Sequence, residues 1–300
     1  MENVRELLDV GVARLRDSGS ESARLDAELL LAYALDTDRT TVIAHTDAPV
    51  GDGAAARFAA TLDRRAAGEP VAYIRGFKEF HGLAFGVDAR ALIPRPETER
   101  LVELAELELI RRLTVAPRSR GAKPIRVIDV GVGSGAVAVT LAVLLRRRKM
   151  LDEVAITAVD VSEDALQLAR ENAVAHAVGD RIEFVNADLL PGGAVNPWDV
   201  VLANLPYVRS GAVPTLPVAT SFEPSLALDG GPDGLRVIAR LLDLLPGSLA
   251  HDGVAMLEIG GDQAVEMRAL ASDRLAAWSC EIELDLGRLP RVAVLRPAAR

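Results

Sequence analysis

Residues 127–135 read VIDVGVGSG, and this stretch decides the fold. Strand-forming residues lead into glycines at alternate positions, and the mostly apolar run 136–145 follows. The pattern predicts a buried strand, a tight turn and a helix, because glycine allows a sharp turn and a close approach of the backbone to a ligand. The turn lacks the lysine of a phosphate-binding P-loop, and its glycine spacing differs from the Gly-x-Gly-x-x-Gly of dinucleotide sites.

Strand-like and helix-like patterns alternate around and after this turn. The expected strands and helices, in chain order, are 126–130, 136–148, 155–159, 163–178, 181–185, 200–203, 235–245, 253–258 and 263–270. Such alternation predicts an α/β fold with a doubly wound, mostly parallel sheet and helices on both faces. Two further strands, near 281–286 and 291–295, predict a closing hairpin with one antiparallel member.

The N-terminal part has a different character. Residues 1–70 are expected to be helical, because apolar side chains recur at helical spacing: Leu7, Leu8, Val12 and Leu15, then Leu25, Leu29 and Ala32, with a later helix over 57–67. Residues 71–93 are rich in apolar and β-forming residues broken by glycines, which predicts short strands or a hairpin. We therefore divide the chain into a helical domain (1–70), a hairpin linker (71–96) and an α/β domain (97–300).

The composition is that of an ordinary globular protein, with 300 residues, 50% of them hydrophobic and 26% charged. A single cysteine, Cys280, excludes a disulfide scaffold, and four scattered histidines give no reason to expect a metal. The net charge of −9 argues against a broad electrostatic grip on bare nucleic acid. The N-terminus does not resemble a signal peptide, and the longest apolar run is too short for a membrane span, so we expect a cytoplasmic protein.

Acidic residues near the glycine-rich turn indicate the kind of ligand. Asp129 precedes the turn, where a carboxylate would oppose a pyrophosphate but suits a ligand that carries an ammonium. S-adenosylmethionine has an ammonium and a sulfonium and no phosphate, so we predict that it binds here. The expected contacts are Asp129, Gly131, Val132, Gly133, Ser134 and Gly135. The alternative is a tight turn that binds no ligand.

Two further aspartates end the next two strands. Asp160 lies about 25 positions after the glycine-rich turn, where a carboxylate can accept both hydroxyls of a ribose. The alternative for Asp160 is a helix cap, but Ser162 is the better candidate for that role. Asp188 could accept a hydrogen bond from an adenine amino group, with Leu189 against the ring. A simple turn aspartate is the alternative for Asp188.

The sequence Asn204-Leu205-Pro206-Tyr207 ends a fourth strand and offers groups for a methyl acceptor. The side-chain oxygen of Asn204 and the carbonyl of Leu205 can accept the two hydrogens of a planar –NH2 group. Pro206 confines Leu205 to an extended backbone, and Tyr207 could wall or stack against the acceptor. We predict in-line methyl transfer, with Asn204 beside both donor and acceptor and with Asn204, Pro206 and Tyr207 as catalytic residues. An Asn-Pro turn without catalytic function is the alternative.

Several motifs together indicate a family. They are PVAYI (70–74), EFHG (79–82), LIPRPETE (92–99), EPSLAL (223–228), DGGPDGL (229–235) and LEIG (257–260). With the glycine-rich turn, they make the chain resemble the peptide chain release factor glutamine N5-methyltransferases, the HemK/PrmC family, over nearly its whole length. The family usually shows Asn-Pro-Pro-Tyr, whereas this chain has Leu205 in place of the first proline, as in the similar motif of rRNA adenine dimethyltransferases.

The resemblance implies both an architecture and a reaction. It implies an N-terminal helical domain and a hairpin linker before a Rossmann-like class I methyltransferase domain. It also implies that S-adenosylmethionine is the donor and that the substrate is the glutamine in the Gly-Gly-Gln loop of release factors. By position, the turn 131–135 would line the methionine part of the donor, Asp160 the ribose, and Asp188 with Leu189 the adenine. Residues 204–207 would hold the glutamine amide.

The same residues are also compatible with two other functions. An adenine N6-methyltransferase acting on RNA or DNA would also need to hold a planar –NH2 group. A donor-binding module associated with translation, without catalysis, would use the same glycine-rich turn. We expect a release factor as the partner, with no direct binding of nucleic acid and no membrane contact.

Overall fold

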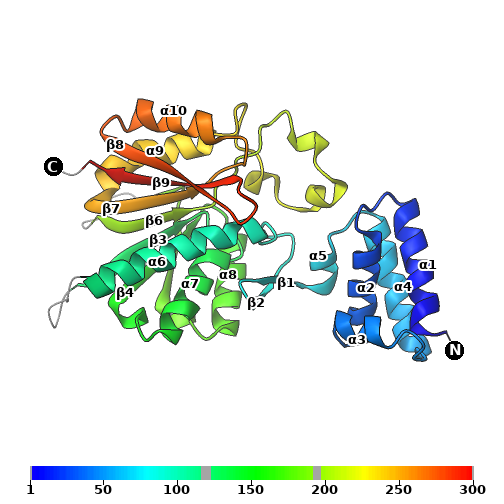
Figure 1. The fold of residues 1–300 in the computed structure, drawn as a ribbon. Helices are drawn as coiled ribbons and strands as arrows, with labels where there is room; N and C mark the ends of the chain where they lie inside the picture. The colour runs from blue at the N-terminus through cyan, green and yellow to red at the C-terminus, as the bar shows by residue number, and fades with distance from the viewer. Residues whose placement is uncertain (1, 116–122, 192–196, 299–300) are drawn as a thin grey trace. The chain divides into compact units, whose positions relative to one another are not determined.

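The computed structural model describes residues 2–115, 123–191 and 197–298, which fall into two compact units (Figure 1). The first unit comprises Met1–Phe77 together with Pro217–Phe222, and the second comprises Lys78–Leu216 and Glu223–Arg300. Within the described residues, no helix has both the length and the apolar character needed to cross a membrane.

The first unit is built from helices. They are α1 (Val4–Asp17), α2 (Ala23–Ala34), α3 (Arg39–Ala44), α4 (Asp52–Ala66) and α5 (Val71–Arg75). Asn3 begins α1 with a capping box, in which its side chain accepts from the amide of Glu6 at 2.9 Å and the Glu6 carboxylate accepts from the amide of Asn3 at 3.0 Å. The apolar face predicted for α1 is buried.

The helix predicted from Leu25, Leu29 and Ala32 is present as α2, with Ala32 buried and Leu25 exposed. The buried face of this helix also carries Asp26 and Glu28 in ion pairs with arginines. One expectation in this unit is wrong. Residues 71–75, expected as a strand, form the helix α5. Gly76, with φ of +77°, ends that helix in the left-handed conformation, which glycine adopts without strain.

The second unit holds a short hairpin and a large sheet. The hairpin pairs β1 (Phe77–Phe80) with β2 (Leu83–Gly86), as predicted for this part of the chain. The strands of the large sheet are β3 (Ile125–Val130), β4 (Val154–Asp160), β5 (Ile182–Asn186), β6 (Trp198–Ala203), β7 (Leu249–Glu258), β8 (Trp278–Leu284) and β9 (Pro290–Pro297). Their order is β5-β4-β3-β6-β7-β9-β8, with β9 antiparallel to both of its neighbours. The predicted doubly wound sheet with one antiparallel member is confirmed.

Helices cover both faces of this sheet (Figure 1). On one face lie α6 (Glu99–Val115), α7 (Ala136–Arg147) and α8 (Glu163–Ala175), and on the other lie α9 (Arg236–Ser248) and α10 (Ala264–Arg274). The side chains of β3 alternate between the two cores, with Val127 in one and Ile128 in the other. Strands are therefore apolar on both faces, which explains why the sequence shows continuous apolar runs there.

The strand order predicts a ligand-binding crevice at the carboxyl ends of the central strands. From β3 the chain proceeds to β4 and β5 on one side, and then returns to β6 on the other side of β3. The order therefore reverses between β3 and β6, and the helices that follow these two strands, α7 and α9, pack on opposite faces of the sheet. In open α/β sheets, ligands bind outside the strand ends at such a reversal.

Candidate active site

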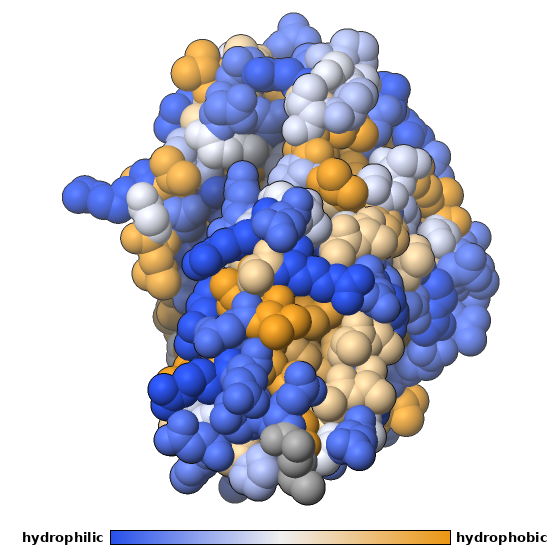
Figure 2. All heavy atoms as spheres, turned by 90° about the vertical axis from the view of Figure 1, so that its right-hand side faces the viewer, coloured by the Kyte–Doolittle hydropathy of each residue, from blue (hydrophilic) through white to orange (hydrophobic). Residues whose placement is uncertain are grey.

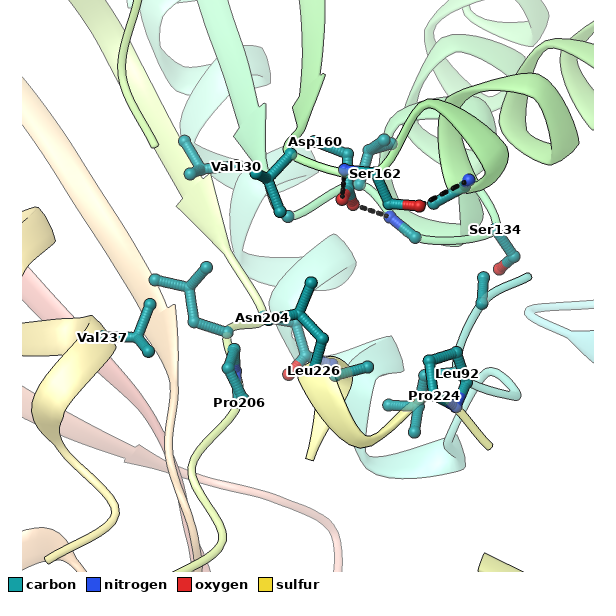
Figure 3. Close-up of a pocket in the computed structure, with 18 of the residues that line it drawn as sticks. Leu92, Val130, Ser134, Asp160, Ser162, Asn204, Pro206, Pro224, Leu226 and Val237 are labelled. Carbon is teal, nitrogen blue, oxygen red and sulfur yellow. Dashed lines mark hydrogen bonds between the residues drawn. The ribbon is translucent and has the colours of Figure 1, made fainter. Parts of the chain in front are cut away.

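A cavity of about 430 Å³ lies at the carboxyl ends of β3, β4 and β6 (Figure 3). Its volume falls in the range that holds small-molecule ligands. The expected site residues that line it are Asp129, Gly131, Val132, Gly133, Ser134, Asp160, Asp188, Leu189, Asn204, Leu205 and Pro206. Gly135 and Tyr207 do not line it. The structure thus brings most of the expected donor and acceptor residues together in one cavity.

The glycine-rich turn forms the floor of the cavity beside β3. The amides of Gly131 and Val132 donate to the carbonyl of Val159 at 2.8 and 2.9 Å, which ties the turn to the end of β4. Gly131 has φ of +76°, and a side chain there would come within 3.0 Å of Leu205. Gly135 instead begins α7 and packs against Ala169. The first glycine therefore keeps the turn close to the acceptor motif, and the last serves helix packing.

Asp129 lies beneath the turn with 2% of its surface exposed. One of its carboxylate oxygens accepts from the amide of Ala138 at 3.0 Å, in the first turn of α7. Burial raises the pKa of Asp129 to about 7, and the nearby Asp160 adds to the rise. A cationic group in the cavity would favour the ionised form, so this position suits a ligand with an ammonium.

Asp160 is held by backbone amides at the end of β4 (Figure 3). Its two oxygens accept from the amides of Gly133 and Ser162, each at 2.9 Å. Burial raises the pKa of Asp160, and these hydrogen bonds oppose the rise. Ser162 caps α8 by accepting from the amide of Ala165, so the cap assigned to Ser162 is confirmed. A carboxylate oxygen can accept more than one hydrogen bond, which leaves Asp160 able to take hydroxyls as well.

Asp188 has a partner that the sequence analysis did not predict. Its carboxylate accepts from the guanidinium of Arg240 at 2.6 Å, and both side chains are more than half exposed. Arg240 comes from α9, 52 positions further along the chain, so only the folded sheet brings the two together. Leu189, next to Asp188, is buried and forms an apolar part of the cavity wall.

The acceptor motif follows β6. The Asn204 side chain donates its Nδ2 hydrogen to the Thr98 hydroxyl at 3.0 Å, and both residues line the cavity. Tyr207 was expected to wall the cavity, but its hydroxyl donates to a carboxylate oxygen of Glu258 at 3.2 Å. Burial and the charge of Glu258 raise the pKa of Tyr207 above its usual value, so the hydroxyl stays a donor. Thr98 and Glu258 were not among the expected site residues, although both lie in motifs that carry the family resemblance, 92–99 and 257–260.

Two motifs far from residues 204–207 in sequence support the walls of the cavity. Glu223 is buried and accepts from the amide of Ile93 at 3.1 Å and from the Arg95 guanidinium at 2.5 Å. It thereby joins the segment before α6 to the loop that contains Leu226. The second motif is the turn 229–235, where a side chain at Gly230 would lie 2.7 Å from the carbonyl oxygen of Pro206. That turn packs directly on the backbone of the acceptor motif.

Comparison with known proteins identifies the family. The PrmC N-terminal domain family matches residues 6–76, and the methyltransferase small domain family matches residues 109–223. The release factor glutamine methyltransferase of Moorella thermoacetica is 38% identical over 270 residues, 89% of each chain. That of Deinococcus radiodurans is 36% identical over 283 residues, 94% of each chain. This chain belongs to the release factor glutamine methyltransferase family.

A solved structure shows the same fold in a more distant protein. The hMettl16 catalytic domain, in complex with a 3′UTR hairpin, is 15% identical with a TM-score of 0.53, and the match covers 83% of each chain. At this identity the likeness concerns the fold alone. It agrees with the Rossmann-like methyltransferase architecture of the second unit.

Enzymes of this family take the methyl group from S-adenosylmethionine, and the residues of the cavity fit that donor. The glycine-rich turn has no lysine or arginine that would match a pyrophosphate. The acidic side chains Asp129 and Asp160 lie on either side of it, and both line the cavity. A close-packed turn flanked by carboxylates suits a ligand that carries an ammonium and a ribose and has no phosphate.

Proposed function

We propose that this chain transfers a methyl group from S-adenosylmethionine to the side-chain amide nitrogen of a glutamine in a peptide chain release factor. The target is the glutamine of the Gly-Gly-Gln loop. The observation that carries the proposal is the position of Asn204, whose Nδ2 is already bound by Thr98 in the cavity wall. The remaining polar atom of that side chain, Oδ1, is the one available to accept from a substrate –NH2 group.

The donor has a proposed place along the carboxyl edge of the sheet. Asp129 and residues 131–134 hold its amino-acid end, and Asp160 accepts from the ribose hydroxyls. Leu189 packs against the adenine, and Asp188 accepts from its amino group. When bound, the donor supplies an electrophilic methyl group. The Leu205 side chain, which lies against Gly131, keeps the acceptor motif in contact with this part of the cavity.

The acceptor groups act by positioning. Asn204 Oδ1 and the Leu205 carbonyl accept the two hydrogens of the glutamine –NH2, which orients the nitrogen toward the methyl group. Transfer would form an N–CH3 bond as the S–CH3 bond of the donor breaks, which would leave the donor as a neutral thioether. The nitrogen would give up one of its protons to solvent, so the product is a neutral N-methylated amide. Orientation of this kind supplies a large part of the rate in a site that excludes water.

We propose that residues 1–70 recognise the release factor and take no part in donor binding. This segment has 13 acidic and 8 basic residues, a balance that suits a basic protein surface and does not suit a nucleic-acid backbone. Figure 2 shows hydrophilic and hydrophobic residues side by side on one face of the molecule. A translation factor as substrate places the activity in the cytoplasm.

One assay separates this function from the two alternatives. The protein is incubated with S-adenosylmethionine and either release factor or rRNA, and the products are analysed by mass spectrometry. Methylation of the release factor glutamine is expected. Methyl found on adenine and never on glutamine would establish a nucleic-acid methyltransferase, and donor binding without any methylated product would establish a binding module.

A further inference from the structure

A buried glutamine, Gln263, lies at the corner between β7 and α10. It is 2% exposed and directly precedes the first residue of α10. Its backbone is held on both sides: its amide donates to the carbonyl of Gly260 at 3.0 Å, and its carbonyl accepts from the amide of Met267 at 2.8 Å. The side chain therefore leaves the corner from a fixed point. A side-chain amide at such a buried position needs partners for both its oxygen and its nitrogen.

Both ends of the Gln263 side chain bind backbone groups. Oε1 accepts from the amide of Gly260 at 2.7 Å, and Nε2 donates to the carbonyl of Tyr207 at 3.0 Å. A backbone N–H can only donate and a backbone carbonyl can only accept, so these partners determine which way the side-chain amide points. The reverse orientation would set a donor against a donor at one end and an acceptor against an acceptor at the other. Gln263 thus joins the chain just after β7 to the last residue of the acceptor motif.

Two glycines leave the space that this side chain occupies. A side chain at Gly260 would lie 2.9 Å from Oε1 of Gln263, and one at Gly234 would lie 2.6 Å from Nε2. A side chain at Gly234 would also clash with the carbonyl oxygen of Tyr207, the group that Gln263 binds. The turn 229–235 and the chain after β7 therefore meet the acceptor motif around this one hydrogen bond.

The acceptor motif needs such support because it has left the sheet. β6 ends directly before the motif begins, so the strand ladder does not extend to Tyr207. Pro206 has no N–H with which to bind a neighbour. Beyond the motif, the amide and the carbonyl of Val208 are bound by residues 228–230, at 3.0 and 2.8 Å. The bond from Gln263 to the Tyr207 carbonyl fixes the peptide that links the motif to Val208.

We propose that Gln263 is a positioning residue for the methyl acceptor, an inference that rests on the proposed function. Gln263 does not line the cavity, so it acts on the substrate only through the backbone of residues 204–207. By holding the Tyr207 carbonyl, it limits rotation of the preceding peptides, including the Leu205 carbonyl that accepts from the glutamine –NH2. A small change in the direction of that carbonyl would turn the target nitrogen away from the methyl group.

The first test removes the side-chain amide and measures turnover. Gln263→Met keeps the length of the side chain and removes the donor, and we expect kcat on release factor to fall roughly tenfold or more. Donor affinity, measured by calorimetry, and KM for release factor should change much less. Gln167→Met is the control for the same substitution, since Gln167 is exposed on α8 and donates to Glu171. Wild-type kcat in Gln263→Met would overturn the proposal.

A second variant separates the hydrogen bond from packing. Gln263→Glu keeps the shape, and its protonated carboxyl group can still donate to the Tyr207 carbonyl while it accepts from Gly260. Ionisation removes that donor, so kcat of this variant relative to the wild type should be highest at low pH and should not rise with pH. A role of side-chain volume alone would give no rescue at low pH. If Gln263→Glu is no faster than Gln263→Met at every pH at which both are folded, the hydrogen bond does not position the motif.

A third measurement does not depend on the substrate. The three tyrosines of the chain are followed by Ala34, Ile74 and Val208. In protein labelled with ¹³C at the tyrosine carbonyls and ¹⁵N at valine, the Tyr207–Val208 peptide alone carries both labels and gives a single peak in an HNCO spectrum. Loss of the hydrogen bond in Gln263→Met should move this carbonyl signal upfield. A Tyr207 signal that does not move would sink the proposal.

Asn172→Leu is the matched control for this signal. Asn172 is also buried, and its Nδ2 donates to the carbonyls of Gly86 and Ser134 at 3.0 and 2.9 Å. These contacts belong to β2 and the glycine-rich turn, so loss of this amide should leave the Tyr207 signal in place. If Gln263→Met moves the signal but the wild type does not methylate release factor, the proposed function fails while the hydrogen bond that positions the motif stands.

Discussion

The two sides of the cavity are built in different ways. On the donor side, residues 129–135 form the turn, and residues 160–162 attach to it through hydrogen bonds to backbone amides. On the acceptor side, residues 204–207 are supported by side chains or glycines from three other places in the chain: Thr98, the turn that holds Gly230 and Gly234, and Glu258. The turn on the donor side is held mainly through its own backbone amides, whereas the acceptor motif is held by side chains and glycines from distant parts of the chain.

This difference predicts how the two sides respond to substitution. Changes in the glycine-rich turn should act through backbone strain and affect donor binding. Changes around the acceptor motif should leave the donor bound and reduce turnover. Variants that change only donor affinity on one side and only turnover on the other support this difference. A variant that changes both quantities would show that the two sides are more closely coupled than their contacts indicate.

The largest effect is expected for Gly133→Val on the donor side. Gly133 has φ of +53°, where a β-branched residue is strongly disfavoured, and it lines the cavity. We expect donor affinity, measured by calorimetry, to fall by roughly a hundredfold or more. Gly247→Ala is the control, because a side chain there meets no atom within 4 Å. Wild-type affinity in Gly133→Val would remove the turn from the donor site.

On the acceptor side, Asn204→Ala should have the largest effect. It deletes the oxygen that we assign to the substrate amide, and loss of one positioning hydrogen bond in such a site commonly costs roughly 10²–10³ in rate. The loss should appear in kcat, while donor affinity changes far less because most donor contacts come from other strands. A variant that loses donor affinity and keeps kcat would place Asn204 on the donor side of the division.

The same division explains what the sequence could predict. The glycine-rich turn and the Ser162 cap are local patterns that could be inferred from residues a few positions apart. The position of Asp160 followed from its place at the end of a predicted strand, although its hydrogen bond to Gly133 joins residues 27 positions apart. The Thr98–Asn204 and Asp188–Arg240 contacts join residues 106 and 52 positions apart, and no local pattern encodes them. Tyr207 was misjudged for the same reason, since its partner Glu258 lies on a different strand.

The helix over residues 23–34 is confirmed, but not all the apolar residues that predicted it are buried. Leu25 is exposed, because the buried face of α2 also carries Asp26, which pairs with Arg65 of α4. Such an ion pair cannot be read from hydrophobic periodicity. Residues 71–75 have β-forming side chains, yet Gly76 in the left-handed region ends a short helix there. Tertiary context overrides propensity in segments this short.

A smaller effect is expected for Gly234→Ala, which tests the turn that packs on the acceptor motif. Gly234 has φ of +77°, and a side chain there would clash with the carbonyl oxygen of Tyr207. Because the neighbour is backbone, the motif itself must shift, and we expect a loss in kcat of roughly tenfold with donor affinity little changed. Gly211→Ala is the control in the same unit, since its added side chain meets nothing within 4 Å. Equal kcat in the two variants would show that the turn does not hold the motif.

The smallest effect is expected for Leu205→Pro, which restores the usual motif of the family. Leu205 is 5% exposed and its side chain lies against Gly131, so the substitution removes part of the contact between the two sides of the cavity. Its carbonyl should keep its direction, because Pro206 already restricts Leu205 to an extended backbone. Activity on release factor should therefore stay within about tenfold of the wild type, or about 1.4 kcal/mol in the barrier. A larger loss in kcat with unchanged donor affinity would show that the leucine side chain itself positions the acceptor. If the wild type methylates adenine and Leu205→Pro does not, Leu205 would instead be a determinant of which planar amine the cavity accepts.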